Sequence, residues 1–106
     1  MIQVKYRTDG KAHSLVITGH AGYAEIGDDI VCAGVSAIVY TLLGWMENND
    51  EELEHKNVSI ESGDVLIYCE GGEKAATAFD MTAIGLEQIA QRYPDNVVIQ
   101  ITGFSG

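Results

Sequence analysis

The sequence predicts an α+β fold, a single-domain sandwich in which two helices pack on a β-sheet in the order ββαββαβ. Extended stretches with alternating apolar residues predict the strands, and two longer stretches with apolar residues at helical spacing predict the helices. With 106 residues and 46% hydrophobic composition, the chain can bury one core but is too short for a second domain. We therefore expect residues 1–106 to form one domain.

The chain opens with a predicted β-hairpin. Apolar and polar residues alternate over Ile2–Tyr6, and Asp9-Gly10 supplies a tight-turn dipeptide. An extended stretch containing Val and Ile resumes over Ala12–Thr18. A loop from Gly19 to Gly27 then leads to the first predicted helix.

The first predicted helix runs from about Ile30 to Met46, with Asp28 or Asp29 as its cap. Apolar residues occupy nearly every face, but small and polar residues interrupt them and acids flank both ends without a basic anchor. This pattern favours a buried helix over a membrane span. A helix that is apolar on all sides must be covered on several sides, so the sequence also favours a homodimer.

The remaining elements follow an acidic segment, Glu47–His55, which we expect to be a solvated loop or a frayed helix end. A second hairpin, an amphipathic helix and a closing strand are predicted at Val58–Glu61 and Val65–Glu70, at Glu73–Tyr93, and at Val97–Ile101. Pro94 ends the second helix.

The charge balance limits the partners that this protein can bind. Sixteen acidic residues against six basic ones give a net charge of −10, which repels phosphate backbones, so we expect no direct binding to nucleic acid. The charge either only keeps the domain soluble or steers a basic protein partner to it. The first residues lack the features of a secretory signal, so we expect a cytoplasmic protein in which Cys32 and Cys69 are free thiols.

Cys32 is the best candidate for a nucleophile. If Asp28 or Asp29 caps the helix, Cys32 falls in the first turn, where unpaired N–H groups and the helix dipole favour a thiolate. His20 on the preceding loop can accept the thiol proton. Asp29 is the nearest acid that could hold the imidazole in the correct tautomer.

The loop glycines Gly19, Gly22 and Gly27 allow backbone angles that other residues avoid, so the loop can fold back and a peptide backbone can approach. Other interpretations of this loop are weaker. A phosphate loop requires Lys-Ser/Thr where this sequence has two aspartates, and no Cys-x-x-Cys or His-x-x-x-His pair supports a zinc site. We therefore expect neither a metal nor a cofactor.

The second cysteine and the other two histidines have simpler interpretations. Cys69 alternates with Val65 and Ile67 on one strand face, which predicts a thiol packed in the core. His13 lies inside a strand and His55 in the acidic segment, and the sequence suggests a partner for neither. We expect both histidines to be incidental.

The stretch GHAGYAEIGDDIVCAGVSAI, Gly19 to Ile38, closely resembles the signature of the ribosomal-processing cysteine protease family known as Prp. The chain length and the acidic ββαββαβ layout are also similar to that family. The resemblance implies that His20 is the catalytic histidine, Cys32 the nucleophile and Asp29 the acid three positions before it. Ser36 matches the serine of the family's Val-Ser element, one helical turn beyond Cys32, where it either contacts substrate or packs.

The resemblance also implies a function. It implies a dimeric cysteine endopeptidase that removes the N-terminal extension of large-subunit ribosomal protein twenty-seven, and an acidic enzyme would attract such a basic substrate. Two other functions stay open: a non-catalytic acidic assembly partner that binds a basic ribosomal protein, and a thiol redox or metal protein. Cleavage that is lost on Cys32→Ala would separate the protease from both.

Overall fold

The helices and strands follow the predicted order. The computed structural model describes residues 1–19 and 26–103, with the backbone alone for residues 26–29. The elements are β1 (Ile2–Thr8), β2 (Ala12–Thr18), α1 (Ile26–Asn48), the short 3-10 turn η1 (Asp50–Glu52), β3 (Glu54–Glu61), β4 (Asp64–Glu70), α2 (Glu73–Arg92) and β5 (Val97–Gly103). The expected α+β fold with the order ββαββαβ is confirmed.

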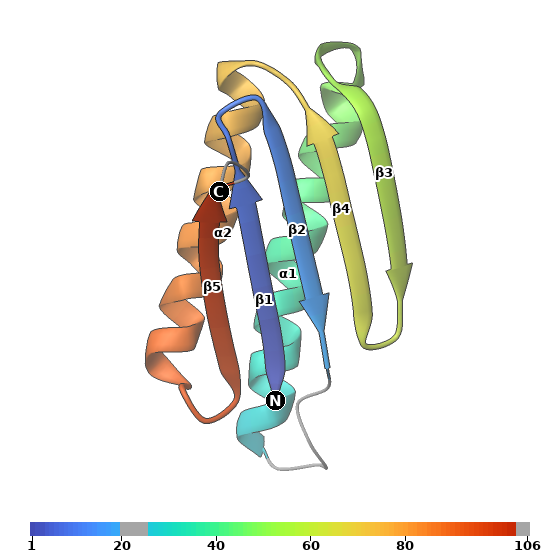
Figure 1. The fold of residues 1–106 in the computed structure, drawn as a ribbon. Coiled ribbons are helices and arrows are strands. Elements are labelled where there is room, and N and C mark those ends of the chain that lie inside the picture. The colour runs from blue at the N-terminus through green and yellow to red at the C-terminus, as the bar shows by residue number, and fades with distance from the viewer. Residues whose placement is uncertain (20–25, 104–106) are drawn as a thin grey trace.

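The strands form one mixed sheet in the order β3-β4-β2-β1-β5. Neighbouring strands are antiparallel except β1 and β5, which run parallel. A parallel pair requires a crossover connection, and α2 provides part of it by carrying the chain from β4 past two strands to β5. Both helices lie on the same face of the sheet (Figure 1), so the domain has two layers.

The core lies between the sheet and the two helices. Alternate residues of β1 enter it, because Ile2, Val4 and Tyr6 are buried while Lys5 and Arg7 are exposed on the other face. Helix α1 contributes a buried stripe at helical spacing, which consists of Val31, Val35, Val39, Leu42 and Met46. Burial of this stripe fixes the rotation of α1 on the sheet.

The two helices pack closely because each presents a glycine to a large side chain. Ile89 of α2 lies 3.2 Å from the position that a β-carbon on Gly34 would take, and Ile38 of α1 lies 3.1 Å from the same position on Gly85. An alanine at either glycine would therefore require the facing isoleucine to shift by a few tenths of an ångström.

Helix α1 is longer at its start than the sequence predicted. It begins at Ile26, so Asp28 and Asp29 lie inside the helix and neither is its cap. Gly27 disfavours helix by about 1 kcal/mol, which made an early start hard to predict. Most helical stability in proteins comes from tertiary packing, and here the stripe that begins at Val31 outweighs that local cost.

The acidic segment Glu47–His55 is also more regular than expected. Helix α1 continues to Asn48, a 3-10 turn follows, and β3 begins at Glu54. Leu53 is buried, and Glu54 pairs with Glu70 of β4. These contacts are with residues distant in sequence, so the local charge pattern could not reveal them.

The outer side of α1 is uncovered in a single chain, whereas the sequence suggested cover on several sides. Ile30, Ala33 and Ala37 are exposed there. By length and composition alone, the stretch Ile30–Asn48 could cross a membrane. Core helices of soluble proteins can have the same length and composition. In this fold the buried stripe of α1 packs against the sheet instead.

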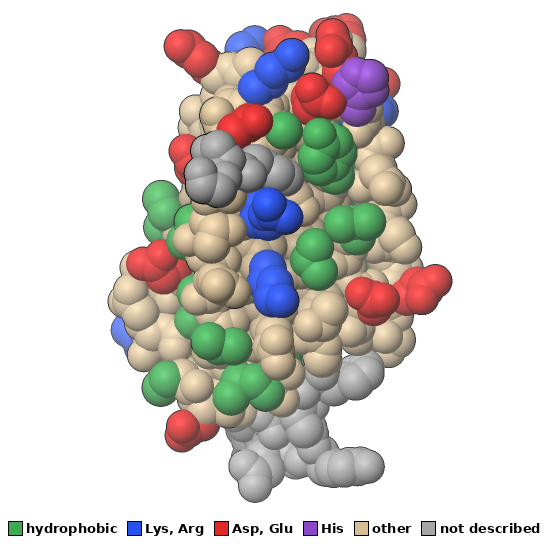
Figure 2. All heavy atoms as spheres, viewed as in Figure 1, with side chains coloured by type: hydrophobic (Ala, Val, Ile, Leu, Met, Phe, Trp, Pro, Cys, Tyr) green, Lys and Arg blue, Asp and Glu red, His purple; other side chains and the backbone are tan. Residues whose placement is uncertain are grey.

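The sheet face opposite the helices is open. Figure 2 shows basic side chains at its centre with hydrophobic side chains on either side. Lys5 of β1 lies there between its register partners, Val16 of β2 and Gln100 of β5. This mixture of side chains is typical of a solvent-facing sheet surface, in contrast to the apolar face under the helices.

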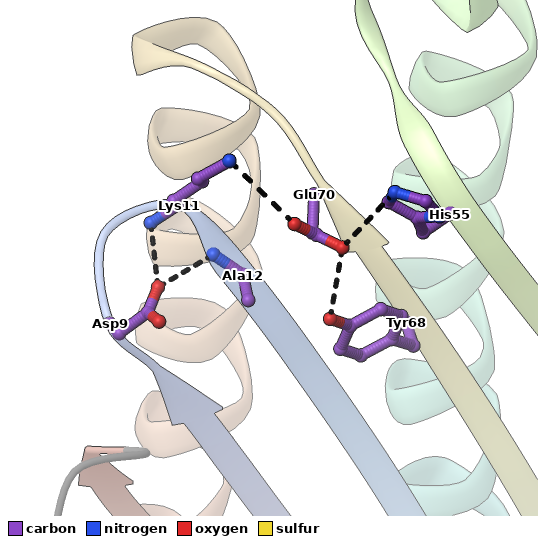
Figure 3. A network of polar contacts seen from close by, with 6 residues as sticks. All are labelled: Asp9, Lys11, Ala12, His55, Tyr68 and Glu70. Atoms are coloured by element: carbon purple, nitrogen blue, oxygen red, sulfur yellow. Dashed lines mark hydrogen bonds and ion pairs between the residues drawn. The ribbon is translucent and has the colours of Figure 1, made fainter.

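A polar network closes the end of the sheet at the β1–β2 turn (Figure 3). Asp9 Oδ1 accepts hydrogen bonds from the backbone N–H groups of Lys11 at 2.9 Å and Ala12 at 2.7 Å, and these bonds lower the pKa of Asp9. Glu70 on β4 lies 3.9 Å from both Lys11 Nζ and His55 Nε2. His55 therefore has a partner that the sequence did not suggest.

His13 is a structural residue, which corrects the expectation that it is incidental. Its ring is fully buried and stacks on Phe79 with the ring centroids 4.9 Å apart. His13 Nδ1 lies 2.9 Å from Thr8 Oγ1 and 3.4 Å from the Tyr6 hydroxyl oxygen. Nε2 has no hydrogen-bond partner among the described residues. A protonated ring would thus be poorly accommodated.

We expect the free energy of unfolding to decrease as pH falls below about 6.5, the ordinary pKa of histidine. Desolvation lowers the pKa of His13 and outweighs Asp80 and Asp9, which raise it. The folded chain therefore keeps this imidazole neutral while the unfolded chain binds a proton, which favours unfolding at lower pH.

Urea denaturation at about pH 7.5 and about pH 5.5 would measure this effect. The His13→Gln variant lacks the titrating group and should lose less stability between the two pH values than the unchanged protein. Equal losses in the two proteins would show that His13 does not contribute.

Candidate active site

A groove lies between α1 and the end of the β3–β4 hairpin. Its volume is about 380 Å³, within the usual range for ligand pockets. Helix α1 contributes Cys32, Val35, Ser36, Val39 and Tyr40, and the strands with their adjoining turns contribute Ile2, Ile17, Gly19 and Ile60–Val65. The candidate nucleophile therefore lies on the wall of a groove that could accept part of a peptide.

Cys32 is exposed because of its position beside the buried stripe of α1. Successive helical residues point about 100° apart, so burial of Val31 turns the next side chain away from the core. Cys32 stands in the second turn, not the expected first, because α1 begins at Ile26. The unpaired N–H groups belong to the first four residues, and the helix dipole weakens beyond the first turn. Cys32 therefore lies beyond the unpaired N–H groups at the start of α1.

The predicted partners of Cys32 fall largely outside the described part of the chain. His20 and Gly22 are outside it entirely. Asp29 and Gly27 are in α1, three and five residues before Cys32, with side chains outside the description. Gly27 therefore belongs to the helix and not to the loop in which the sequence placed it.

Gly19 joins three segments at one end of the groove. Its N–H donates to the carbonyl oxygen of Gly63 at 3.0 Å, which ties the end of β2 to the β3–β4 turn. Its φ of +95° is one that side chains disfavour, and a β-carbon here would collide with the backbone carbonyl oxygen of Met1. Only glycine fits at this position, directly before His20 in the sequence.

The structure adds groove residues that the sequence analysis did not identify. Ser36 was predicted and is exposed in the groove, and Tyr40 lies a further helical turn along the same wall. Tyr40 lies eight residues after Cys32, and residues at that spacing share one helix face. The sequence spacing could therefore have identified Tyr40 as a groove residue. The hairpin stretch Ile60–Val65 had no such signal, because only the sheet order brings it to Cys32.

The second cysteine is in a different environment. Cys69 is 0% exposed, which confirms the predicted core thiol, and it is opposite His13 in the β2–β4 register. Desolvation raises the pKa of Cys69 to about 11. A shielded thiol that stays protonated at neutral pH is a poor nucleophile, so Cys69 is not a candidate for the nucleophile.

The sequence matches one family over almost its whole length. A family model described as cysteine protease Prp matches residues 1–98. The ribosomal processing cysteine protease Prp of Mycoplasma genitalium is 34% identical over 85 residues, which are 80% of this chain and 84% of that protein. The protein of the same name from Mycoplasma pneumoniae is 33% identical over 86 residues, which are 77% and 80% of the two chains.

Solved structures share the fold. The ribosomal processing protease Prp of Staphylococcus aureus, in complex with a covalently linked product peptide, gives a TM-score of 0.81 at 24% identity and covers 95% of this chain and 99% of that one. A Streptococcus mutans protein gives a TM-score of 0.75 at 27% identity, with 97% and 95% of the two chains covered.

Iodoacetamide should label Cys32 in the folded protein much faster than Cys69. Cys32 is exposed, whereas burial shields Cys69 and raises its pKa. Peptide mapping after brief labelling measures both sites, and labelling in urea is the control that both thiols can react. Modification of Cys69 before Cys32 in the folded protein would contradict this assignment.

Gly19→Ala should destabilise the fold more than Gly10→Ala. The two glycines have nearly the same φ, +95° and +92°, but only Gly19 has backbone atoms in the space that a β-carbon needs. We expect Gly10→Ala to cost about 1–2 kcal/mol from the backbone angle alone and Gly19→Ala about 3 kcal/mol or more. Chemical denaturation of both variants measures the two losses in the free energy of unfolding, and their difference is the effect of the collision. Equal losses would show that the backbone at Met1 moves aside.

Proposed function

Because the chain belongs to the cysteine protease Prp family, we propose that it is an endopeptidase that removes the N-terminal extension of large-subunit ribosomal protein twenty-seven. One structural observation carries the proposal. Cys32 is exposed on the wall of a groove of about 380 Å³, while the other cysteine is buried. The relatives named as ribosomal processing proteases support a ribosomal substrate. In this proposal residues 1–106 act as a single cysteine-protease domain.

In the proposed mechanism Cys32 and His20 work as a dyad. The imidazole of His20 accepts the thiol proton as Cys32 Sγ attacks the carbonyl carbon of the scissile bond. The same proton then passes to the leaving amine, which departs and leaves a thioester on Cys32. Water, deprotonated by His20, hydrolyses the thioester and releases the new carboxyl group. Asp29 holds the imidazole in the correct tautomer.

We assign substrate binding to Ser36 and to three glycines. Ser36 is exposed one helical turn beyond Cys32 on the same wall, where its hydroxyl group can hydrogen-bond a peptide. Gly19 lines the groove, and Gly22 follows it in the sequence. Gly27 lies in the first turn of α1, whose N–H groups have no partner within the helix. Without side chains, these glycines let the substrate backbone approach.

The charge of the protein suits a basic substrate. The net charge is −10, and two acids, Glu61 and Asp64, are in the groove itself. A basic ribosomal protein would be attracted to this surface, whereas free nucleic acid would be repelled. We propose that the protein acts in the cytoplasm and that its reaction uses neither a metal nor a cofactor.

We further propose that the protein is a homodimer that pairs through its helical layer. Large apolar side chains are exposed on both helices, namely Ile30 on α1 and Met81 and Ile84 on α2, beside the small residues Ala33 and Ala37. Small residues let helices of two subunits approach closely, and exposed apolar area is typical of interfaces. Sedimentation should give a dimer that Ile84→Glu converts to a monomer. A monomeric unchanged protein would contradict this proposal.

Cys32→Ala and His20→Ala should each lower kcat/KM by about a thousandfold or more, and the double variant should be no worse than either. Two groups that act as one unit lose their joint effect when either is removed. Mass spectrometry of the ribosomal protein before and after incubation measures the loss of its extension and locates the cut.

One control and two contrary outcomes separate the alternative functions. Cys69→Ala should leave cleavage intact, because that thiol is buried away from the groove. Binding of the ribosomal protein without cleavage would instead indicate a non-catalytic assembly partner. Dependence of the activity on added metal or on oxidant would indicate a metal protein or a thiol redox protein.

A further inference from the structure

The groove continues along α1 beyond the nucleophile. Cys32, Ser36 and Tyr40 follow one another at four-residue intervals and all line it. Such spacing places three side chains in a row, and at 1.5 Å rise per residue Tyr40 lies about 12 Å from Cys32 along the helix axis. An extended peptide advances about 3.3 Å per residue, so this length accommodates about three to four residues.

Exposed apolar side chains line this extension of the groove. Tyr40 on α1 is 65% exposed and Ile60 on β3 is 45% exposed, although both are large. Ile17, Val65 and Ile60 occupy one register row across β2, β4 and β3, so an apolar floor runs from beneath α1 to the edge strand. Apolar and aromatic linings of this kind are typical of ligand sites.

From this arrangement we propose that Tyr40 and Ile60 form a subsite for an apolar side chain of the substrate, about three to four residues from the bond that Cys32 attacks. The inference rests on the proposed peptidase function and adds a specificity determinant to it. The occupant is an extended peptide because the subsite is continuous with the groove that holds Cys32. The proposed dimer surface uses Ala33 and Ala37, and Ala33 lies seven residues before Tyr40 on nearly the same side of α1, so the subsite adjoins that surface.

The test compares peptides that span the cut site of the ribosomal protein. One peptide is complete, a second has Ser in place of each apolar residue three or four positions from the cut, and a third ends two positions from the cut on each side. The enzymes are the unchanged protein, Tyr40→Ala, Tyr40→Phe and Ile60→Ala. Ile101→Ala is the matched control, because Ile101 on β5 is 48% exposed, close to the exposure of Ile60, and does not line the groove.

On the complete peptide, Tyr40→Ala and Ile60→Ala should each lower kcat/KM by about tenfold, mainly through KM. Tyr40→Phe should stay within about twofold, since the ring and not the hydroxyl group makes the contact, and Ile101→Ala should not differ from the unchanged protein. The serine-substituted peptide should be cleaved more weakly than the complete peptide by the unchanged enzyme. Tyr40→Ala should cleave the two peptides almost equally. All the enzymes should cleave the short peptide equally.

Equal losses on the complete and short peptides would overturn the subsite, because Tyr40 would then act on the fold or on the nucleophile. No loss on the complete peptide would overturn it as well. If the unchanged protein cuts no peptide, the proposed function fails, and the subsite is tested by binding. Fluorescence anisotropy should then show about tenfold weaker binding of the complete peptide to Cys32→Ala/Tyr40→Ala than to Cys32→Ala, and equal affinities would overturn the subsite.

Discussion

The rotation of α1 on the sheet is the constraint on which the rest of the site depends. The helix buries Val31, Val35 and Val39 against the strands, and each such side chain contributes about 1.5–3 kcal/mol when it leaves water. With that stripe turned inward, the residues one position later, Cys32, Ser36 and Tyr40, must emerge beside it. The same packing that stabilises the fold therefore presents the nucleophile and the rest of the groove wall.

The opposite wall depends on a junction of three strand ends. Gly19 contacts the first residue of the chain and binds the turn at Gly63, so the ends of β1, β2 and the β3–β4 hairpin meet next to Cys32. The other end of the sheet has a different character, with the charged network around Glu70 and the buried His13 cluster below it. The structural polar contacts and the candidate active site thus lie at opposite ends of the sheet (Figure 1).

The environments of the two cysteines separate the candidate functions. A dithiol redox site needs two thiols that can meet, but Cys69 is buried under the helices while Cys32 is exposed on α1. The one accessible thiol instead stands in a groove of a size that suits peptide binding, which agrees with the family's peptidase chemistry.

The sequence by itself determined the order of strands and helices, the burial of Cys69 and the candidate role of Cys32, because local periodicity and a long motif encode them. Helix ends and the strand from Glu54 were missed, since packing outweighs local propensity there. Only the tertiary structure decided that Ile60–Val65 would face Cys32, and that Gly19 would pack on Met1. Those contacts follow from sheet order and register, which join residues far apart in the chain and leave no local pattern.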